Sequence, residues 1–192
     1  MTNRCDWANS SPEMQAYHDN EWGHPEHAVP VLFELLCLET YQAGLSWQTV
    51  INKRPAFRRD FYKYDVARVA AMTDDDLERL LTDKAIIRNR LKLTATINNA
   101  RVLANWSESV PFDEWLWNFV DGRPVRHAVT TMAEMPATTE LAKAIAKAMK
   151  KLGFKFVGPT TVYSFLQAAG LVNDHLLSCD WAPENQAKGV SK

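Results

Sequence analysis

Two cysteines and two histidines, divided between the two ends of the chain, have side chains that could together bind a metal ion. Twelve residues separate Cys5 from His18, and three separate His175 from Cys179. The second pair would therefore project from one face of a helix, at positions i and i+4. Two thiolates and two imidazoles form a tetrahedral donor set that suits zinc, at distances of about 2.0–2.3 Å. Such a site would join the N-terminal segment to the C-terminal segment.

The spacing leaves other arrangements open. His24 and His27 are rival ligands, and Cys5 and Cys179 could instead be free thiols beside ordinary polar histidines. A disulfide between these cysteines is less favoured, because a reducing compartment keeps thiols free. Cys37 lies in the apolar run LFELLCL, so we expect it to be a core residue.

A second group of residues combines aromatic rings with a carboxylate. Glu34 and Glu39 are five residues apart, about 140° around a helix, so both cannot lie at the centre of one solvated face and one of them should point towards protein. A carboxylate among aromatic rings would suit a flat, cationic ligand with an N–H donor. The alternative is an aromatic core with Glu39 exposed. The tryptophans and tyrosines of the first 47 residues are Trp7, Tyr17, Trp22, Tyr41 and Trp47.

A turn with a glycine at each end, between two predicted helices, is suited to binding phosphate. The segment 150–161 has the sequence KKLGFKFVGPTT, in which Gly153 and Gly158 permit a tight turn and Pro159 begins the second helix. The N–H groups at the start of a helix can bind a phosphate oxygen. The pattern is that of a helix-hairpin-helix motif, which holds a DNA strand by its backbone without recognising sequence. Because residues 143–155 contain five lysines, we favour phosphate binding over a hairpin that only turns a corner.

Helices must position nearly all of these side chains. No period-2 alternation of any length competes with the helical patterns, so the sequence predicts an all-α fold with short connections. We expect residues 1–181 to form one compact unit and residues 182–192 to be a loose tail. The expected helices cover residues 30–43, 55–62, 66–72, 74–82, 85–105, 111–120, a segment that begins after Thr139 and ends before Gly153, and a last one from Pro159 to just before Gly170.

Charge is strongly segregated along the 192 residues, although the net charge is only −1. Residues 43–72, 84–106 and 141–158 are basic, and the last two of these blocks contain no acid. The alternative to a binding role is that these blocks are the solvated faces of amphipathic helices. A polyanion could be bound if two basic groups share one face, namely Lys53, Arg54, Arg58 and Arg59 with Lys147, Lys150, Lys151 and Lys155.

Membrane insertion and secretion are not expected. No apolar run approaches the roughly 20 residues of a membrane span. The first six residues, MTNRCD, lack the apolar stretch of a signal peptide. We therefore expect a cytoplasmic protein without a membrane partner.

Five segments in order resemble the bacterial 3-methyladenine DNA glycosylase I family, which is part of the helix-hairpin-helix glycosylase superfamily. They run from residue 4 to His175 with their spacing intact: RCDW (4–7), YHDNEWG (17–23), CLETYQAGLSW (37–47), GFKFVG (153–158) and GLVNDH (170–175). The resemblance implies an all-helical fold with one structural zinc ion. The ligands that it implies are those suggested by the spacing: Cys5, His18, His175 and Cys179.

The resemblance also implies a base pocket and a DNA-binding surface. Glu39 would be the catalytic residue and accept a hydrogen bond from the exocyclic amine of an extruded adenine. Trp47 and Tyr17 would pack against the ring, and Trp7 and Trp22 would complete the pocket. Met14 is a departure, since some relatives have a tyrosine there. The implied DNA contacts are Gly44, Leu45 and Ser46, which resemble the segment that enters the DNA, together with Lys151, Gly153, Lys155, Gly158 and Thr160 in the hairpin.

The implied reaction is hydrolysis of the N-glycosidic bond of 3-methyladenine, with 3-methylguanine as a second candidate, in base-excision repair of double-stranded DNA with alkylated bases. A lysine nucleophile would follow the second hairpin glycine in relatives that cut the strand, but here Pro159 and Thr160 follow it. We therefore expect an abasic product, a monomer and no obligate protein partner. Asp174 is favoured as a helix cap or histidine partner over a catalytic group. The alternatives are a non-catalytic, zinc-stapled DNA-binding module and a metalloenzyme, and four protein ligands disfavour the second.

Overall fold

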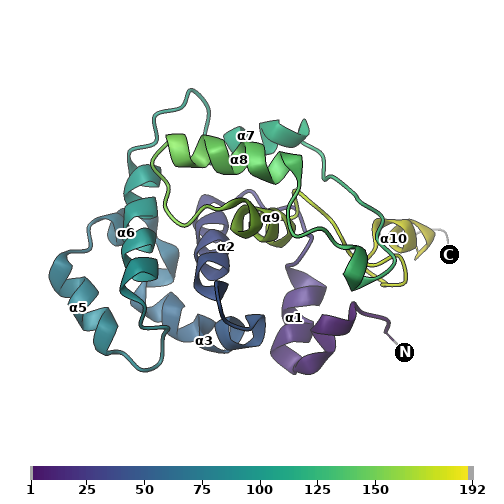
Figure 1. Cartoon of the computed structure of the whole chain (residues 1–192), viewed down its shortest axis with the longest axis horizontal. Helices are drawn as coiled ribbons and strands as arrows, with labels where there is room; N and C mark the ends of the chain where they lie inside the picture. Colours follow the sequence, from purple (N-terminus) through teal and green to yellow (C-terminus); the bar gives the residue numbers. More distant parts are fainter. Residues whose placement is uncertain (1, 190–192) are drawn as a thin grey trace.

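Helix α2 (Val29–Gln42) runs through the centre of the computed structural model, which describes residues 2–189 (Figure 1). Every residue from Leu32 to Tyr41 is buried, as expected for a helix that is apolar on most of its circumference. Around it pack α3 (Trp47–Asp60), α6 (Arg90–Ala104), α7 (Phe112–Trp117) and α9 (Pro159–Ala168).

The remaining elements are short helices on both sides of this core. The sole β-type pairing among the described residues is an isolated bridge between Val125 and Val172, so the prediction of an all-α fold is confirmed. The α-helices are α1 (Pro12–Asn20), α4 (Val66–Ala70), α5 (Asp74–Thr82), α8 (Glu140–Lys151) and α10 (Pro183–Gly189). The 3-10 helices are η1 (Asp6–Ser10), η2 (Tyr62–Tyr64), η3 (Asn118–Val120) and η4 (Met132–Glu134).

Side-chain caps set the starts of several predicted helices. The Thr73 hydroxyl accepts a hydrogen bond from the Asp76 N–H, and the Asp76 carboxylate accepts one from the Thr73 N–H, which makes a capping box for α5. The Asp65 side chain caps α4 in the same sense, and Thr139 caps α8. The predicted starts of these helices are therefore confirmed.

Two predicted boundaries are wrong. We expected Pro55 to begin a helix, but it lies inside α3, which begins at Trp47 because the Ser46 hydroxyl caps it. The proline removes one backbone donor, yet residues on both sides of it, such as Val50 and Phe57, are fully buried. Tertiary packing thus outweighs the local cost. The helix that we expected over residues 85–105 is α6. It begins at Arg90 and not at residue 85, because the Asn89 side chain caps it.

The C-terminal segment also differs from the prediction. His175 and Cys179 lie in an irregular stretch after α9 and not on one helix. The supposed loose tail forms α10 over Pro183–Gly189, and Asn185 fixes it by donating to the Leu177 and Cys179 carbonyls at 2.9 and 2.8 Å. Residues 190–192 lie outside the described part of the chain.

The two ends of the described chain meet at one end of the molecule, where α1 and α10 lie (Figure 1). The Asp180 N–H donates to the Asn3 carbonyl at 2.8 Å, and the Trp181 indole donates to the Asp19 carbonyl at 2.8 Å. No helix among the described residues is long and apolar enough to cross a membrane.

Candidate functional site

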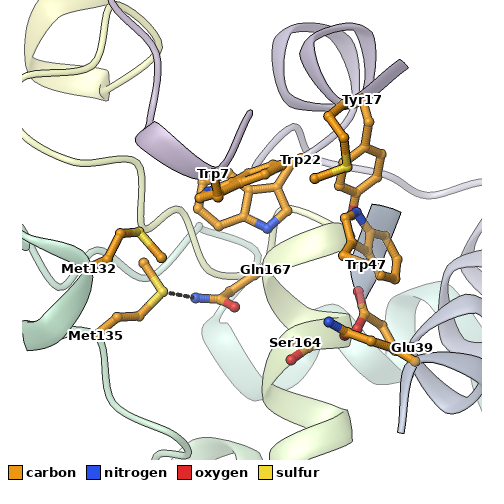
Figure 2. Close-up of a pocket in the computed structure, with 11 residues that line it drawn as sticks. Trp7, Tyr17, Trp22, Glu39, Trp47, Met132, Met135, Ser164 and Gln167 are labelled. Carbon is orange, nitrogen blue, oxygen red and sulfur yellow. Dashed lines mark hydrogen bonds between the residues drawn. The ribbon is translucent and has the colours of Figure 1, made fainter. Parts of the chain in front are cut away.

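A cavity of about 230 Å³ lies where α1, α2, α3 and α9 meet (Figure 2). It contains all five residues of the predicted base pocket. The loop between α7 and α8 closes it on the remaining side. The lining residues are Trp7, Met14, Tyr17, Trp22, Glu39, Gln42, Trp47, Met132, Met135, Ser164 and Gln167.

Four aromatic rings line the cavity. The Trp7 and Trp22 rings meet edge to face with centroids 5.2 Å apart, and the Tyr17 and Trp47 rings are tilted with centroids 5.2 Å apart. The Tyr17 hydroxyl and the Trp47 indole N–H are buried and have no hydrogen-bond partner within the described chain. A buried polar group without a partner is costly, so these two groups suit a ligand that offers them one.

Glu39 is the one carboxylate among the described residues that line the cavity. Its side chain makes no hydrogen bond to any described residue, and only 6% of the residue is exposed. Burial raises the pKa of Glu39 to about 8, because the charged form loses its hydration. A perturbed, unpartnered carboxylate in a cavity is a candidate for function.

The expectation that the two glutamates of α2 do not share a solvated face is confirmed, and both of them point towards protein. Glu34 is 5% exposed, and its carboxylate accepts hydrogen bonds from Arg54 at 2.7 Å and from Arg58 at 2.6 Å. Glu34 thus has charged partners, whereas Glu39 has none among the described residues. Arg54 also forms a bidentate pair with Glu21.

These ion pairs remove much of the first predicted basic surface. Arg59 likewise pairs with Asp60 and Asp83, and Lys53 donates to two backbone carbonyls. The arginines of this block are thus paired with carboxylates, and the face that they would share with the α8 lysines stays a prediction. The lysines of α8 and the hairpin are exposed, and only Lys143 pairs with a carboxylate in the described structure.

Five of the lining residues were missed by the sequence analysis. Met132 and Met135 belong to the α7–α8 loop, which pairs with the segment after α9 through Val125 and Val129. Nothing in the loop sequence indicates this pairing. Ser164 lies on α9, four residues after the predicted site residue Thr160, so helical spacing could have indicated it. The five missed residues are Gln42, Met132, Met135, Ser164 and Gln167.

A groove continues from the cavity towards the predicted DNA-binding residues. It is lined by Gly44 and Leu45 from the α2–α3 loop and by Thr160 from the start of α9, and it shares Glu39 with the cavity. Leu45 is an exposed apolar side chain, 42% accessible. Ser46 is exposed and caps α3. The predicted loop and the start of α9 therefore meet beside the cavity mouth.

Buried Lys92 supports this loop from beneath. Its ammonium donates to the Tyr41 carbonyl at 2.9 Å and to the Ala43 carbonyl at 2.6 Å. These carbonyls belong to the last turn of α2 and its cap, where a cation is favourable. Lys92 thus fixes the path by which the chain reaches Gly44, and the sequence analysis did not find it.

The hairpin between α8 and α9 is held by two asparagines of α6 that the sequence analysis also missed. Asn99 accepts from the Lys155 N–H at 2.8 Å and donates to the Lys155 carbonyl at 3.1 Å. Asn98 donates to the Gly153 carbonyl at 2.9 Å. Gly153 has a φ of +97°, which a side chain would disfavour. Gly158 is the N-cap residue of α9.

The predicted metal ligands come together where the chain ends meet. The donor atoms of Cys5, His18 and Cys179 all lie within 4.8 Å of one another. The His175 ring lies 4.8 Å from the His18 ring, and its buried Nε2 has no partner in the described structure. The rival His27 lies elsewhere, stacked on the ring of Trp117.

Two neighbouring side chains orient the imidazoles. Asp19 lies 2.9 Å from Nδ1 of His18, and the Asn173 oxygen lies 2.9 Å from Nδ1 of His175. In His175 this leaves Nε2 for another partner, as in metal-binding histidines. Nε2 of His18 lies 3.4 Å from the Cys5 backbone nitrogen and 3.5 Å from the Cys179 sulfur. Burial lowers the pKa of His175 to about 3 and so keeps this ring neutral. Cys179 also has a pKa below its ordinary value, since the Cys5 thiol hydrogen-bonds to it.

Asp174 is fully buried and pairs with a histidine. His127 Nδ1 lies 2.8 Å from one carboxylate oxygen, while the other accepts from the Tyr163 hydroxyl and from the Gln167 amide. Asp174 does not line the cavity. Its place in the structure is thus that of a histidine partner within a hydrogen-bonded network.

A sequence model of the methyladenine glycosylase family matches residues 7–182, most of the chain. The chain belongs to the methyladenine glycosylase family. DNA-3-methyladenine glycosylase 1 of Escherichia coli is 48% identical over 184 residues, which cover 95% of this chain and 98% of that protein. The family resemblance carried by the five sequence segments is therefore confirmed.

Solved structures of methyladenine glycosylases share the fold. A crystal structure of 3-methyladenine DNA glycosylase I has a TM-score of 0.89 and 49% identity, and the match covers 94% of this chain and all of that one. A structure of the Staphylococcus aureus enzyme, described as the basis of its 3-methyladenine recognition, has a TM-score of 0.87 and 37% identity over 92% of this chain and 94% of that one.

Proposed function

We propose that the protein is a DNA-3-methyladenine glycosylase that hydrolyses the N-glycosidic bond of 3-methyladenine in double-stranded DNA and leaves an abasic site. The observation that carries this proposal is an aromatic cavity with a single buried, unpartnered carboxylate, in a chain of the methyladenine glycosylase family. The relatives are named for 3-methyladenine. The strand itself stays uncut, because no lysine follows Gly158.

The cavity suits the charge of the damaged base. Methylation at N3 makes adenine cationic, and a cation is attracted to the faces of Trp47 and Tyr17. Glu39 accepts a hydrogen bond from the exocyclic amine, and the cationic ring favours its ionised form. Normal adenine is uncharged, and it costs more to unstack and unpair than a damaged base. Selection is thus by charge, shape and the exposed N–H donors.

The reaction needs little acid catalysis, because cleavage releases a neutral base from a cationic nucleotide. Glu39 is the catalytic residue in the sense that it contacts this departing base. Asp174 is committed to Tyr163, Gln167 and His127, so it is not free to activate water. Binding of the extruded base in the cavity supplies selection, whereas contacts that strengthen as the glycosidic bond breaks supply the rate enhancement.

DNA binding is assigned to the surface beside the groove, where the α2–α3 loop and the start of α9 lie. The hairpin of residues 152–158 and the start of α9 form a helix-hairpin-helix motif whose N–H groups bind a phosphate. Lys151 and Lys155 add positive charge, with Gly153, Gly158 and Thr160 at the backbone contact. Leu45, between Gly44 and Ser46, fills the space that the extruded base leaves. The protein acts on DNA as a cytoplasmic monomer.

One structural zinc ion is assigned to the four residues at the meeting chain ends. The donor set fits this ion: two thiol sulfurs lie beside two imidazoles, and the orphaned Nε2 of His175 lacks any other partner among the described residues. Four protein ligands fill a tetrahedral shell, so this ion would bind no water and would serve structure. Cys5, His18, His175 and Cys179 would hold it.

Incubation with methylated double-stranded DNA, followed by chromatography of the released bases, tests the proposed function. We expect free 3-methyladenine in the supernatant and a strand that breaks only after alkaline treatment of the abasic site. Retention of DNA without release of any base would instead identify a non-catalytic DNA-binding module. Unmodified DNA is the control.

A further inference from the structure

Gln167 lies in the last turn of α9 and supplies a polar side chain to the cavity wall. Only 6% of the residue is exposed. Its own carbonyl accepts from the Gly23 N–H at 2.9 Å, which ties this turn to the segment that carries Trp22. The backbone from which the side chain projects is therefore fixed.

The neighbours of Gln167 decide which way its amide faces. Its nitrogen donates to the Asp174 carboxylate at 2.9 Å and to the Met135 sulfur at 3.2 Å. A carboxylate and a thioether are acceptors only, so the NH₂ group must face them. Figure 2 shows the amide nitrogen turned towards Met135 and the oxygen on the other side of the amide. The oxygen makes no hydrogen bond to any described residue and is left for the cavity.

The rest of the network keeps Asp174 an acceptor. The Tyr163 hydroxyl donates to the same carboxylate oxygen as Gln167, and His127 Nδ1 lies 2.8 Å from the other. Three groups with N–H or O–H donors thus surround one fully buried carboxylate. A half-turn of the Gln167 amide would place its oxygen against this carboxylate, which is unfavourable.

We propose that Gln167 is a specificity-determining residue whose amide oxygen accepts a second hydrogen bond from the exocyclic amine of the base, in addition to the one that Glu39 accepts. This inference rests on the proposed function and deepens it. Adenine has an amine with two N–H groups at C6, whereas guanine has a carbonyl oxygen there. With 3-methylguanine, this carbonyl oxygen would face the amide oxygen of Gln167, and neither atom can donate a hydrogen bond. The cavity therefore favours 3-methyladenine over 3-methylguanine, and Asp174 is the positioning residue that fixes the preference.

Gln167→Met tests this proposal, because methionine keeps the length of the side chain and removes the acceptor. We expect kcat/KM for release of 3-methyladenine to fall about tenfold, with release of 3-methylguanine unchanged within about twofold. The ratio of kcat/KM for 3-methyladenine to kcat/KM for 3-methylguanine thus falls about tenfold. Tyr163→Phe is the matched control, since it removes one hydrogen bond from Asp174 and leaves the Gln167 amide oriented. Its ratio should equal that of the wild type.

Asp174→Asn provides a second, independent variant. Asparagine can accept or donate, so the Gln167 amide is free to turn and the ratio should fall in the same direction although Gln167 is intact. Thermal unfolding shows which variants are folded. For a variant that is folded only at low temperature, quenching of tryptophan fluorescence by free 3-methyladenine and 3-methylguanine there gives the same comparison.

The outcomes are distinct. An unchanged ratio in Gln167→Met, or an equal loss for both bases, would overturn the role of Gln167 while the wild type still releases 3-methyladenine. An equal loss would mark Gln167 as a structural residue only. Wild-type protein that releases neither base would refute the proposed function, and this inference with it.

Discussion

Glu39 is held where its charged form is disfavoured until a ligand arrives. No described residue offers it a hydrogen bond, whereas Glu34, on the same helix, has two arginine partners. Burial raises the pKa of Glu39 to about 8, so the empty cavity holds it mostly protonated at neutral pH. A cationic base with an N–H donor reverses that preference, because it supplies both the counter-charge and the hydrogen bond. The arrangement therefore distinguishes a charged base from a neutral one.

Replacing Glu39 with glutamine should impair base release and leave DNA binding intact. The amide keeps the shape of the side chain but has no charge to stabilise the cationic ring. We expect kcat/KM on methylated DNA to fall roughly 10- to 100-fold, with an unchanged dissociation constant for undamaged DNA. The single-turnover rate of base release measures the loss of activity. Full activity in Glu39→Gln would remove the residue from the proposed mechanism.

The same substitution should stabilise the fold, and the difference should grow with pH. The folded-state pKa of Glu39, about 8, lies above its ordinary value of 4.5. The stability that this group contributes is thus fully present below pH 4.5 and is lost as pH rises through about 8. Glutamine does not titrate. We expect the Tm of Glu39→Gln to exceed that of the wild type by a few degrees at pH 9, and by less at pH 5. An identical pH dependence in the two proteins would show that Glu39 is not buried as described.

At this scale the sequence was informative about residues with distinctive chemistry. The four aromatic residues of the cavity and Glu39 could be grouped because all five lie within the first 47 residues. Met132 and Gln167 could not, since they reach the cavity only through the path of a long loop and the rotation of α9. Their residue types are common in cores and surfaces alike, so no local pattern marks them.

Helix α8, the hairpin and α9 act as one element that presents positive charge. Asn99 clamps the hairpin backbone at Lys155 from both sides, and Thr139 fixes the start of α8. The lysines that follow are exposed, in contrast to the arginines of α3, which are neutralised by carboxylates. Of the basic blocks considered for a shared face, the α8–α9 element is thus the one left to meet a polyanion.

Replacing Lys150, Lys151 and Lys155 with glutamine should weaken DNA binding and flatten its salt dependence. Each phosphate contact contributes about −0.9 to the slope of log K against log salt. The slope should therefore become less steep by up to about 3 if all three lysines meet phosphates. Fluorescence anisotropy with labelled duplex DNA at several salt concentrations measures it.

A matched control removes three basic residues from another part of the surface. Lys63, Arg68 and Arg79 are exposed and belong to η2, α4 and α5. Their replacement with glutamine lowers the net charge equally but should leave the slope nearly unchanged. Equal slopes in the two triple variants would mean that the hairpin face does not bind the phosphates.

Some helix starts were predicted from their capping residues, whereas the starts capped by Ser46 and Asn89 were not. Thr73, Asp65 and Thr139 mark helix starts in the sequence and in the structure alike. Pro55 is a strong local signal for a helix start, but buried residues on both sides carry α3 through it. The same holds for α10, which forms where the sequence indicates a tail, because Asn185 ties it to the segment around Cys179.

At the scale of the whole molecule, the cavity depends on how the two ends of the chain are joined. Trp7, Tyr17 and Trp22 come from the first 22 residues. The α7–α8 loop, which supplies Met132 to the cavity, pairs with the segment after α9. Cys5 and His18 lie in the same N-terminal segment as the first group, while His175 and Cys179 lie in that C-terminal segment. The sequence could indicate this link because ligand types are few. The irregular conformation of 171–182 could not be foreseen, since it is fixed by long-range contacts such as that of Arg126 with the Asn173 carbonyl.

Removing one proposed zinc ligand should therefore destabilise the protein more than it alters the chemistry of bound DNA. In Cys179→Ala we expect the loss of one zinc ion per chain, measured by elemental analysis, and a Tm lower by at least several degrees. Cys37→Ala is the matched control, because Cys37 is buried in α2 away from the cluster and should keep the metal. A chelator should lower the Tm of the wild type and leave that of Cys179→Ala unchanged. Wild-type protein purified without stoichiometric zinc would contradict the metal site, and the buried Nε2 of His175 would then need another partner.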